Sequence, residues 1–156
     1  MQGLYLPKKL KMSSLKQFLL QKKYSLIKLT TTATEHLQLT CTINNVSGDF
    51  ILDTGASNSC VDFKYADYFK LLTEDSKVRA AGAGATNMLT RSSTKNSLNI
   101  GNWTYSKFNL VLFDMTHVNQ ALVEHESEVI HGIIGADILN AGKAIIDYKK
   151  KRLYLK

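Results

Sequence analysis

A short apolar run that passes directly into an aspartate restricts the possible folds of this chain more than any other feature. Phe50-Ile51-Leu52 is continuously apolar, which is typical of a strand buried on both faces. Asp53 follows at once, in a position where an unpaired charge would be costly. Thr54 and Gly55 then offer a hydroxyl and an unhindered backbone N–H, and the two residues after them are small. An acid in such a loop either caps a turn or is presented as a reagent, and turn chemistry alone favours the cap.

A second apolar run near the C-terminal end changes that balance. Ile133-Ile134-Gly135 again predicts a buried strand that ends at a glycine. Ala136 to Leu139 predicts a short helix after it, and Asp137 could cap this helix. The chain therefore holds two buried strands, about eighty residues apart, that each end in a tight small-residue loop.

These two segments, Phe50-Ile51-Leu52-Asp53-Thr54-Gly55-Ala56-Ser57 and Ile133-Ile134-Gly135-Ala136-Asp137-Ile138-Leu139, together resemble the retropepsin-like aspartic proteases of the pepsin/retropepsin superfamily. In that family the first segment carries the catalytic Asp-Thr/Ser-Gly loop. The second crosses behind the loop and precedes the C-terminal helix. The resemblance covers residues 37–156. It implies a mostly β, retropepsin-like acid-protease half-barrel with a short C-terminal helix. An N-terminal amphipathic helix, expected from the sequence pattern described below, lies outside the resemblance.

The resemblance also implies an activity, the hydrolysis of peptide bonds in a polypeptide substrate. Two-lobed members carry two such loops and this chain has one, so a homodimer would supply the second Asp53. Asp53, Thr54 and Gly55 would be catalytic, and the glycine-rich stretch 80–85 would form a flap over the substrate. Substrate-binding positions are then Ala56, Ala83, Gly84 and Ala85, and the supporting motif is Ile133, Ile134, Gly135 and Asp137. The mechanism needs no cofactor and no metal.

One departure from the viral members bears on the expected dimer. Those proteins often carry an Arg after the late glycine, where it joins an ion-pair network at the base of the dimer, and this chain has Ala136. The alternative function is a non-catalytic peptide-binding or dimerisation module with the same fold.

The net charge of +7 invites a third interpretation, a nucleic-acid-binding protein. Seven lysines precede the first acidic residue, Glu35, and the remaining chain carries 13 basic and 13 acidic side chains. The excess therefore lies in an N-terminal arm, for which we favour a solubilising role over contact with phosphates or an anionic surface. Aromatic residues are not interleaved with the lysines as a single-strand platform would require. We expect no nucleic-acid partner and no membrane association.

The N-terminal arm also shows a helical pattern. Ser14 and Gln17 resemble a capping box, and Leu15, Phe18 and Leu19 share one face, which predicts a helix over residues 14–22. We expect a basic leader and helix over residues 1–23 and the protease-like domain over residues 24–156. The sequence shows no secretory signal pattern and no long apolar run, so we expect a cytoplasmic protein.

Alternating apolar residues then predict strands at Tyr24 to Leu29 and at Leu37 to Ile43, with hairpin turns at residues 44–48 and 101–102. Phe63 to Leu72 is expected to be a short helix with Tyr65, Phe69 and Leu72 on one side. Residues 115–127 are expected to be irregular, with room for a short helix. The C-terminal strand Arg152 to Leu155 could join an intersubunit sheet or fold back on its own domain.

Other reactive side chains are interpreted as structural. Cys41 and Cys60 have strand-like apolar neighbours and are expected to be small buried side chains. His125 and Glu128 could share a helix face, but no third ligand lies at metal spacing. Asp147 lacks the loop residues that follow Asp53 and is expected to be a strand-end or turn carboxylate.

Overall fold

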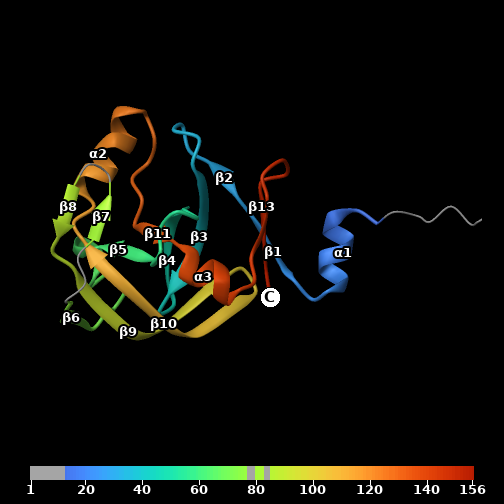
Figure 1. The fold of residues 1–156 in the computed structure, drawn as a ribbon, viewed down its shortest axis with the longest axis horizontal. Coiled ribbons are helices and arrows are strands. Elements are labelled where there is room, and N and C mark those ends of the chain that lie inside the picture. The colour runs from blue at the N-terminus through green and yellow to red at the C-terminus, as the bar shows by residue number, and fades with distance from the viewer. Residues whose placement is uncertain (1–12, 77–79, 83–84) are drawn as a thin grey trace, which may run out of the picture.

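The computed structural model describes residues 13–76, 80–82 and 85–156, which are mostly β-strand with a few short helices (Figure 1). The helices are α1 (Leu15–Gln21), the 3-10 helix η1 (Phe63–Tyr65), α2 (Thr116–Glu124) and α3 (Ala136–Ala141). The strands are β1 (Ser25–Lys28), β2 (Thr30–Thr31), β3 (Leu37–Ile43), β4 (Val46–Leu52), β5 (Cys60–Asp62), β6 (Thr73–Asp75), β7 (Ala80–Gly82), β8 (Ala85–Met88), β9 (Arg91–Ile100), β10 (Trp103–Phe113), β11 (Gly132–Ile134), β12 (Ile145–Asp147) and β13 (Arg152–Leu155). The predicted fold class is confirmed.

The main sheet closes on itself. Its strands lie in the order β2-β3-β4-β11-β5-β10-β9-β6, and β3 pairs additionally with β9. In β3 the alternation predicted from the sequence is realised, with Leu37, Leu39, Cys41 and Ile43 all buried. They belong to one apolar cluster together with side chains of β4, β9, β10 and β11.

The turn at residues 101–102 forms as predicted, whereas the turn expected over residues 44–48 is confined to Asn44 and Asn45 because Val46 already begins β4. Asn44 and Asn45 both have positive φ, 50° and 65°, as the two central residues of a type I′ hairpin turn require. Gly101 has φ +57° between β9 and β10. These turns set the registers of β3 with β4 and of β9 with β10.

Strand β11 lies between β4 and β5, and this placement brings together the two motifs found in the sequence. It runs parallel to β4, with Ile134 opposite Leu52, and antiparallel to β5. The second apolar run therefore lies beside the strand that ends at Asp53, as the family resemblance implies.

A second sheet holds the first and the last strand of the described chain. Its order is β1-β13-β12, so the C-terminal strand lies in the middle and is paired on both sides by its own chain. Of the two arrangements left open for residues 152–155, the structure shows the one within the chain. Helix α1 precedes β1 and stands off the body (Figure 1). Its capping box between Ser14 and Gln17 is formed as predicted. No helix in the described ranges has the length and apolar character needed to cross a membrane.

The helix expected over Phe63 to Leu72 is largely absent. Only the three residues of η1 form a 3-10 helix, followed by turns that end at Lys70, which has φ 54°. The helical pattern would place Phe69 and Leu72 on the same face. Instead Phe69 is 0% exposed and packs against Phe50, whereas Leu72 is 87% exposed. The burial of Phe69 therefore outweighs the helical pattern. Conversely, residues 115–127 contain the regular helix α2.

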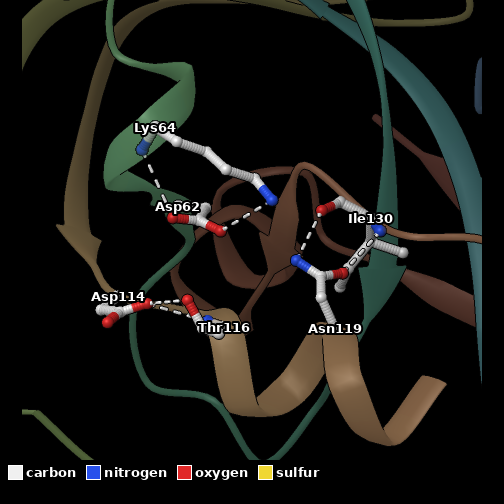
Figure 2. Close-up of polar contacts among 6 residues, drawn as sticks. All are labelled: Asp62, Lys64, Asp114, Thr116, Asn119 and Ile130. Carbon is white, nitrogen blue, oxygen red and sulfur yellow. Dashed lines mark hydrogen bonds and ion pairs between the residues drawn. The ribbon is translucent and has the colours of Figure 1, made fainter. Parts of the chain in front are cut away.

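Side-chain contacts hold the chain around α2 (Figure 2). The Asn119 side chain accepts a hydrogen bond from the Ile130 backbone N–H at 2.9 Å and donates to the Ile130 carbonyl oxygen at 3.3 Å. Both members are buried, so this pair positions the segment that enters β11. Asp62, at the end of β5, lies 3.7 Å from the Lys64 ammonium and accepts from the Lys64 backbone N–H.

Candidate active site

Asp53 stands in a loop at the end of β4 and is exposed to solvent in the single chain. Its backbone N–H donates to the Ile134 carbonyl oxygen at 3.0 Å, which extends the β4–β11 pairing to the loop itself. The Gly55 N–H donates to carboxylate oxygen Oδ1 of Asp53 at 2.8 Å. This hydrogen bond fixes the orientation of the carboxylate. The contact between Gly55 and Asp53 anticipated from the sequence is present, so the acid is both oriented and accessible.

The two motifs also contact each other after the loop turns. The Ala56 N–H donates to the Asp53 carbonyl oxygen at 3.3 Å, and the Ala136 N–H donates to the Ala56 carbonyl oxygen at 2.7 Å. Gly135 lies between these contacts, and a Cβ on it would stand 2.6 Å from the Ala56 carbonyl oxygen. The glycine is needed because any side chain there would push the loop away.

Ser59 connects the Asp53 loop to α3, and the sequence analysis did not single it out. Its backbone N–H and hydroxyl both donate to Oδ1 of Asp137, at 3.0 and 2.7 Å, and its hydroxyl accepts from the Gly135 N–H at 2.9 Å. Ser59 is fully buried. Its position just before a buried strand weakly indicates that Ser59 is buried. The sequence does not indicate its partners, which lie 76 and 78 residues away.

The expected cap by Asp137 is not made. The N-cap of α3 is Gly135, which makes no side-chain cap, and Asp137 lies in the first turn of the helix. Its carboxylate turns to Ser59 because two donors of that residue converge on it. A carboxylate in the first turn is still favoured by the helix dipole.

Thr54 and Gly55 are exposed beside Asp53. An open pocket of about 340 Å³ begins at Thr54 and continues over α3 and the start of β12. Its lining residues are Thr54, Ala136, Leu139, Asn140, Lys143, Ala144 and Ile146. The lining therefore combines apolar side chains with the polar side chains of Thr54, Asn140 and Lys143.

The expected flap corresponds to a separate two-stranded sheet of β7 and β8, in which Gly82 pairs with Ala85. Ala85 begins β8. Ala83 and Gly84, the other two flap positions, lie outside the described residues.

The thiols cannot serve as nucleophiles in this fold. Cys41 and Cys60 are free and buried. Burial is the main cause that raises the pKa of Cys60 to about 12, with smaller contributions from the nearby Asp137 and Asp53 carboxylates. Burial likewise raises the pKa of Cys41 far above its ordinary value. Both thiols therefore stay protonated near neutral pH.

The other residues with reactive side chains have structural partners. His131 accepts a hydrogen bond from the Asp49 N–H through Nδ1 and packs beside Tyr65, with ring centroids 4.5 Å apart. His125 and Glu128 do not share a helix, because α2 ends at Glu124. Within the described residues, no three His, Cys, Asp or Glu side chains gather closely enough to hold a metal ion. Asp147 accepts from the Lys150 N–H in the β12–β13 turn, as expected of a turn carboxylate.

Comparison with known proteins agrees with this geometry. The sequence model of the family described as "aspartyl protease" matches residues 39–138, which include the first motif and the second motif up to Ile138. No curated protein sequence matches the chain significantly.

Three solved structures share the fold. A retropepsin-like aspartic protease from Rickettsia conorii is 20% identical, with 85% of this chain and 91% of that chain covered and a TM-score of 0.55. The EIAV protease complexed with the inhibitor HBY-793 is 18% identical, with 72% and 92% covered and a TM-score of 0.53. The retroviral protease-like domain of Ddi1 from Leishmania major is 21% identical, with 78% and 88% covered and a TM-score of 0.54. Because the family model spans most of the chain, with both motifs in place, this protein belongs to the aspartyl protease family and has a retropepsin-like fold.

Proposed function

We propose that the chain is an aspartic endopeptidase whose catalytic dyad consists of Asp53 from two identical chains. The observation that carries the proposal is the state of Asp53 in the single chain, where the carboxylate is exposed and is oriented by the Gly55 N–H. An aspartate that only caps a turn would not need the second motif, which is hydrogen-bonded to this loop. The protease domain would span residues 24–156.

The chemistry follows from placing two such carboxylates together. At a separation of about 3 Å they cannot both ionise, so they share one proton, and the apparent pKa values belong to the pair. The ionised carboxylate takes a proton from a water molecule held between the two, and the water oxygen attacks the scissile carbonyl carbon. The protonated carboxyl donates to the carbonyl oxygen and stabilises the tetrahedral intermediate. Return of a proton to the leaving nitrogen completes the hydrolysis without a covalent intermediate.

The neighbouring residues take supporting roles in this proposal. Thr54, which is exposed at the edge of the pocket, would bond across the two-fold axis and stiffen both loops. Backbone groups of Ala56 and of the flap positions Ala83, Gly84 and Ala85 would pair with an extended substrate as an added strand. The substrate is therefore expected to be an unfolded or extended polypeptide segment.

The test is cleavage of an unfolded protein mixture across about pH 3–8 by the native chain and by Asp53→Asn. Asp147→Asn is the matched control, because Asp147 also ends a short apolar strand but only accepts a turn hydrogen bond. Cleavage by the native chain and the control, but not by Asp53→Asn, would support the proposal. Cleavage that survives Asp53→Asn would overturn the dyad. A dimer that binds peptides but cleaves none would favour the non-catalytic module.

A further inference from the structure

Helix α1 exposes apolar side chains that the domain does not cover. Leu15 and Phe18 are each 47% exposed and Leu20 is 43% exposed, whereas Leu19 alone is buried. Leu15 and Phe18 are three residues apart and so lie side by side on one face of the helix. The helix stands off the body, at the opposite end from the β7–β8 hairpin (Figure 1). Three of its four apolar residues therefore contact solvent, at the end of the molecule away from the β7–β8 hairpin (Figure 1).

The charged side chains of this helix and of the neighbouring sequence before Glu35 are all positive. Lys16, Lys22 and Lys23 are exposed, and the Lys22 ammonium lies 5.7 Å from the centroid of the Phe18 ring. In the sequence, Lys8, Lys9 and Lys11 precede the helix, and no acidic residue occurs before Glu35. Apolar and basic side chains thus occur together in one short segment.

Contrary to the expectation from the sequence of a solubilising arm without membrane association, we infer that α1 docks the protein onto anionic membrane surfaces. An interfacial helix inserts leucine and phenylalanine side chains at the boundary between headgroups and acyl chains, while its lysines remain at the level of the anionic headgroups. Leu15 and Phe18 supply the apolar insertion, and Lys22 beside Phe18 supplies the headgroup contact. Neither the apolar side chains nor the lysines suffice alone. A seven-residue helix offers little apolar area, and lysines without inserted apolar side chains bind a membrane weakly.

Charge and chemistry argue against the two other occupants of this surface. A second copy of α1 would bring equal positive charge against Lys16, Lys22 and Lys23, which opposes self-association. A nucleic acid would satisfy the lysines but would leave the aliphatic side chain of Leu15 without a partner, since phosphates and sugars offer it no apolar surface.

The experiment is co-sedimentation of the full chain with vesicles of phosphatidylcholine alone or with about 30% phosphatidylserine. We expect partitioning to the phosphatidylserine vesicles at low salt that falls by about tenfold or more at high salt. The double variant Leu15→Ser/Phe18→Ser and the triple variant Lys16→Gln/Lys22→Gln/Lys23→Gln should each reduce it by about tenfold. Both sets of side chains are exposed, so circular dichroism and thermal unfolding of the domain should stay unchanged.

Matched controls lie on the body of the protein. Leu72→Ser/Leu89→Ser removes two exposed leucines, 87% and 70% exposed, and Lys149→Gln/Lys150→Gln removes two exposed lysines of the β12–β13 turn. Neither should change partitioning. Equal binding to neutral vesicles, or loss in the controls as great as in the α1 variants, would overturn the inference. A different outcome would be salt-sensitive binding to a single-stranded oligonucleotide that survives Leu15→Ser/Phe18→Ser, together with no vesicle binding. This outcome would overturn the inference and identify a nucleic acid as the partner of α1. Self-association that those substitutions abolish, again without vesicle binding, would also overturn it and identify a second copy as the partner.

Discussion

Ser59 joins the Asp53 loop to the second motif through hydrogen bonds that add to the backbone contacts of Asp53 and Ala56. One buried side chain and its backbone N–H serve the Asp137 carboxylate and the Gly135 N–H together. The position of Asp53 therefore depends on a hydroxyl that is remote from the proposed chemistry.

Replacing Ser59 by Ala should test that dependence. The substitution removes the hydroxyl bonds and leaves the Gly135 N–H and the Asp137 carboxylate under-satisfied, so we expect a loss of about 2–3 kcal/mol in the free energy of unfolding. Urea denaturation measures it. Ser57→Ala, at an exposed position of the same loop, should cost less than about 0.5 kcal/mol. An equal effect of both substitutions would contradict the role given to Ser59.

Gly135 should tolerate even a methyl group poorly. In Gly135→Ala the new Cβ would lie 2.6 Å from the Ala56 carbonyl oxygen, so the loop must shift. We expect a cost of about 1–3 kcal/mol in unfolding free energy and, in the active protein, a large loss of kcat from the displaced Asp53. Peptide cleavage and urea denaturation together check this. Gly55→Ala is the comparison, because its Cβ would lie 3.2 Å from the movable Asp53 carboxylate oxygen rather than from backbone.

At this scale, local contacts could be predicted from the sequence and distant ones could not. The Gly55–Asp53 hydrogen bond spans two residues and follows from turn chemistry. The Ser59–Asp137 pair spans 78 residues. Nothing near Asp137 in the sequence shows that the donors of Ser59, rather than the backbone N–H groups of its own helix, will bind its carboxylate. The cap assigned to Asp137 was wrong for that reason.

Among the elements, α2 has a charged feature at its start that can be tested by pH. The Asp114 carboxylate accepts hydrogen bonds from the hydroxyl and the backbone N–H of Thr116 (Figure 2). These bonds, the hydroxyl first, lower the pKa of Asp114 below its ordinary value. Because the folded-state pKa lies below the unfolded one, the contact stabilises the fold above the unfolded pKa and is lost as the pH falls through the folded pKa.

Thr116→Val removes the larger of these two causes. We expect the titration midpoint of the Asp114 carboxyl, followed by NMR, to rise toward its ordinary value while the remaining backbone bond keeps part of the shift. The difference in free energy of unfolding between Thr116→Val and the native chain should shrink as the pH falls below the titration midpoint of Asp114. Thr104→Val, an exposed position on β10, is the control. An unmoved midpoint would show that the hydroxyl is not the cause.

The elements differ in how far the sequence determines them. The hairpin turn at Asn44-Asn45 and the capping box of α1 follow from local residue types, and both are confirmed. The expected helix over residues 63–72 failed because the burial of Phe69 is a tertiary effect. The partner of β13 was left open because a strand pattern names no partner, and the choice between β1, β12 and another chain depends on the whole fold.

For the whole molecule, the proposed shared site makes a prediction about mixtures. A dimer with one Asp53→Asn chain has only one carboxylate in the dyad. If native and Asp53→Asn chains associate at random in equal amounts, about one quarter of the dimers keep both carboxylates. Cleavage should therefore fall to about one quarter of that of the same total amount of native chain. Half the activity instead would mean that each chain acts alone.

The exposure of Asp53 in the single chain has a kinetic consequence. If the complete site exists only when two chains meet, then below the dissociation constant the amount of enzyme varies with the square of the amount of chain. A tenfold dilution would cost about a hundredfold in proteolysis, and a modest local accumulation would restore it. Such a protein would have little proteolytic activity while its concentration is low and would become active only where it accumulates. The timing of proteolysis would then be set by the concentration of the chain itself rather than by an inhibitor.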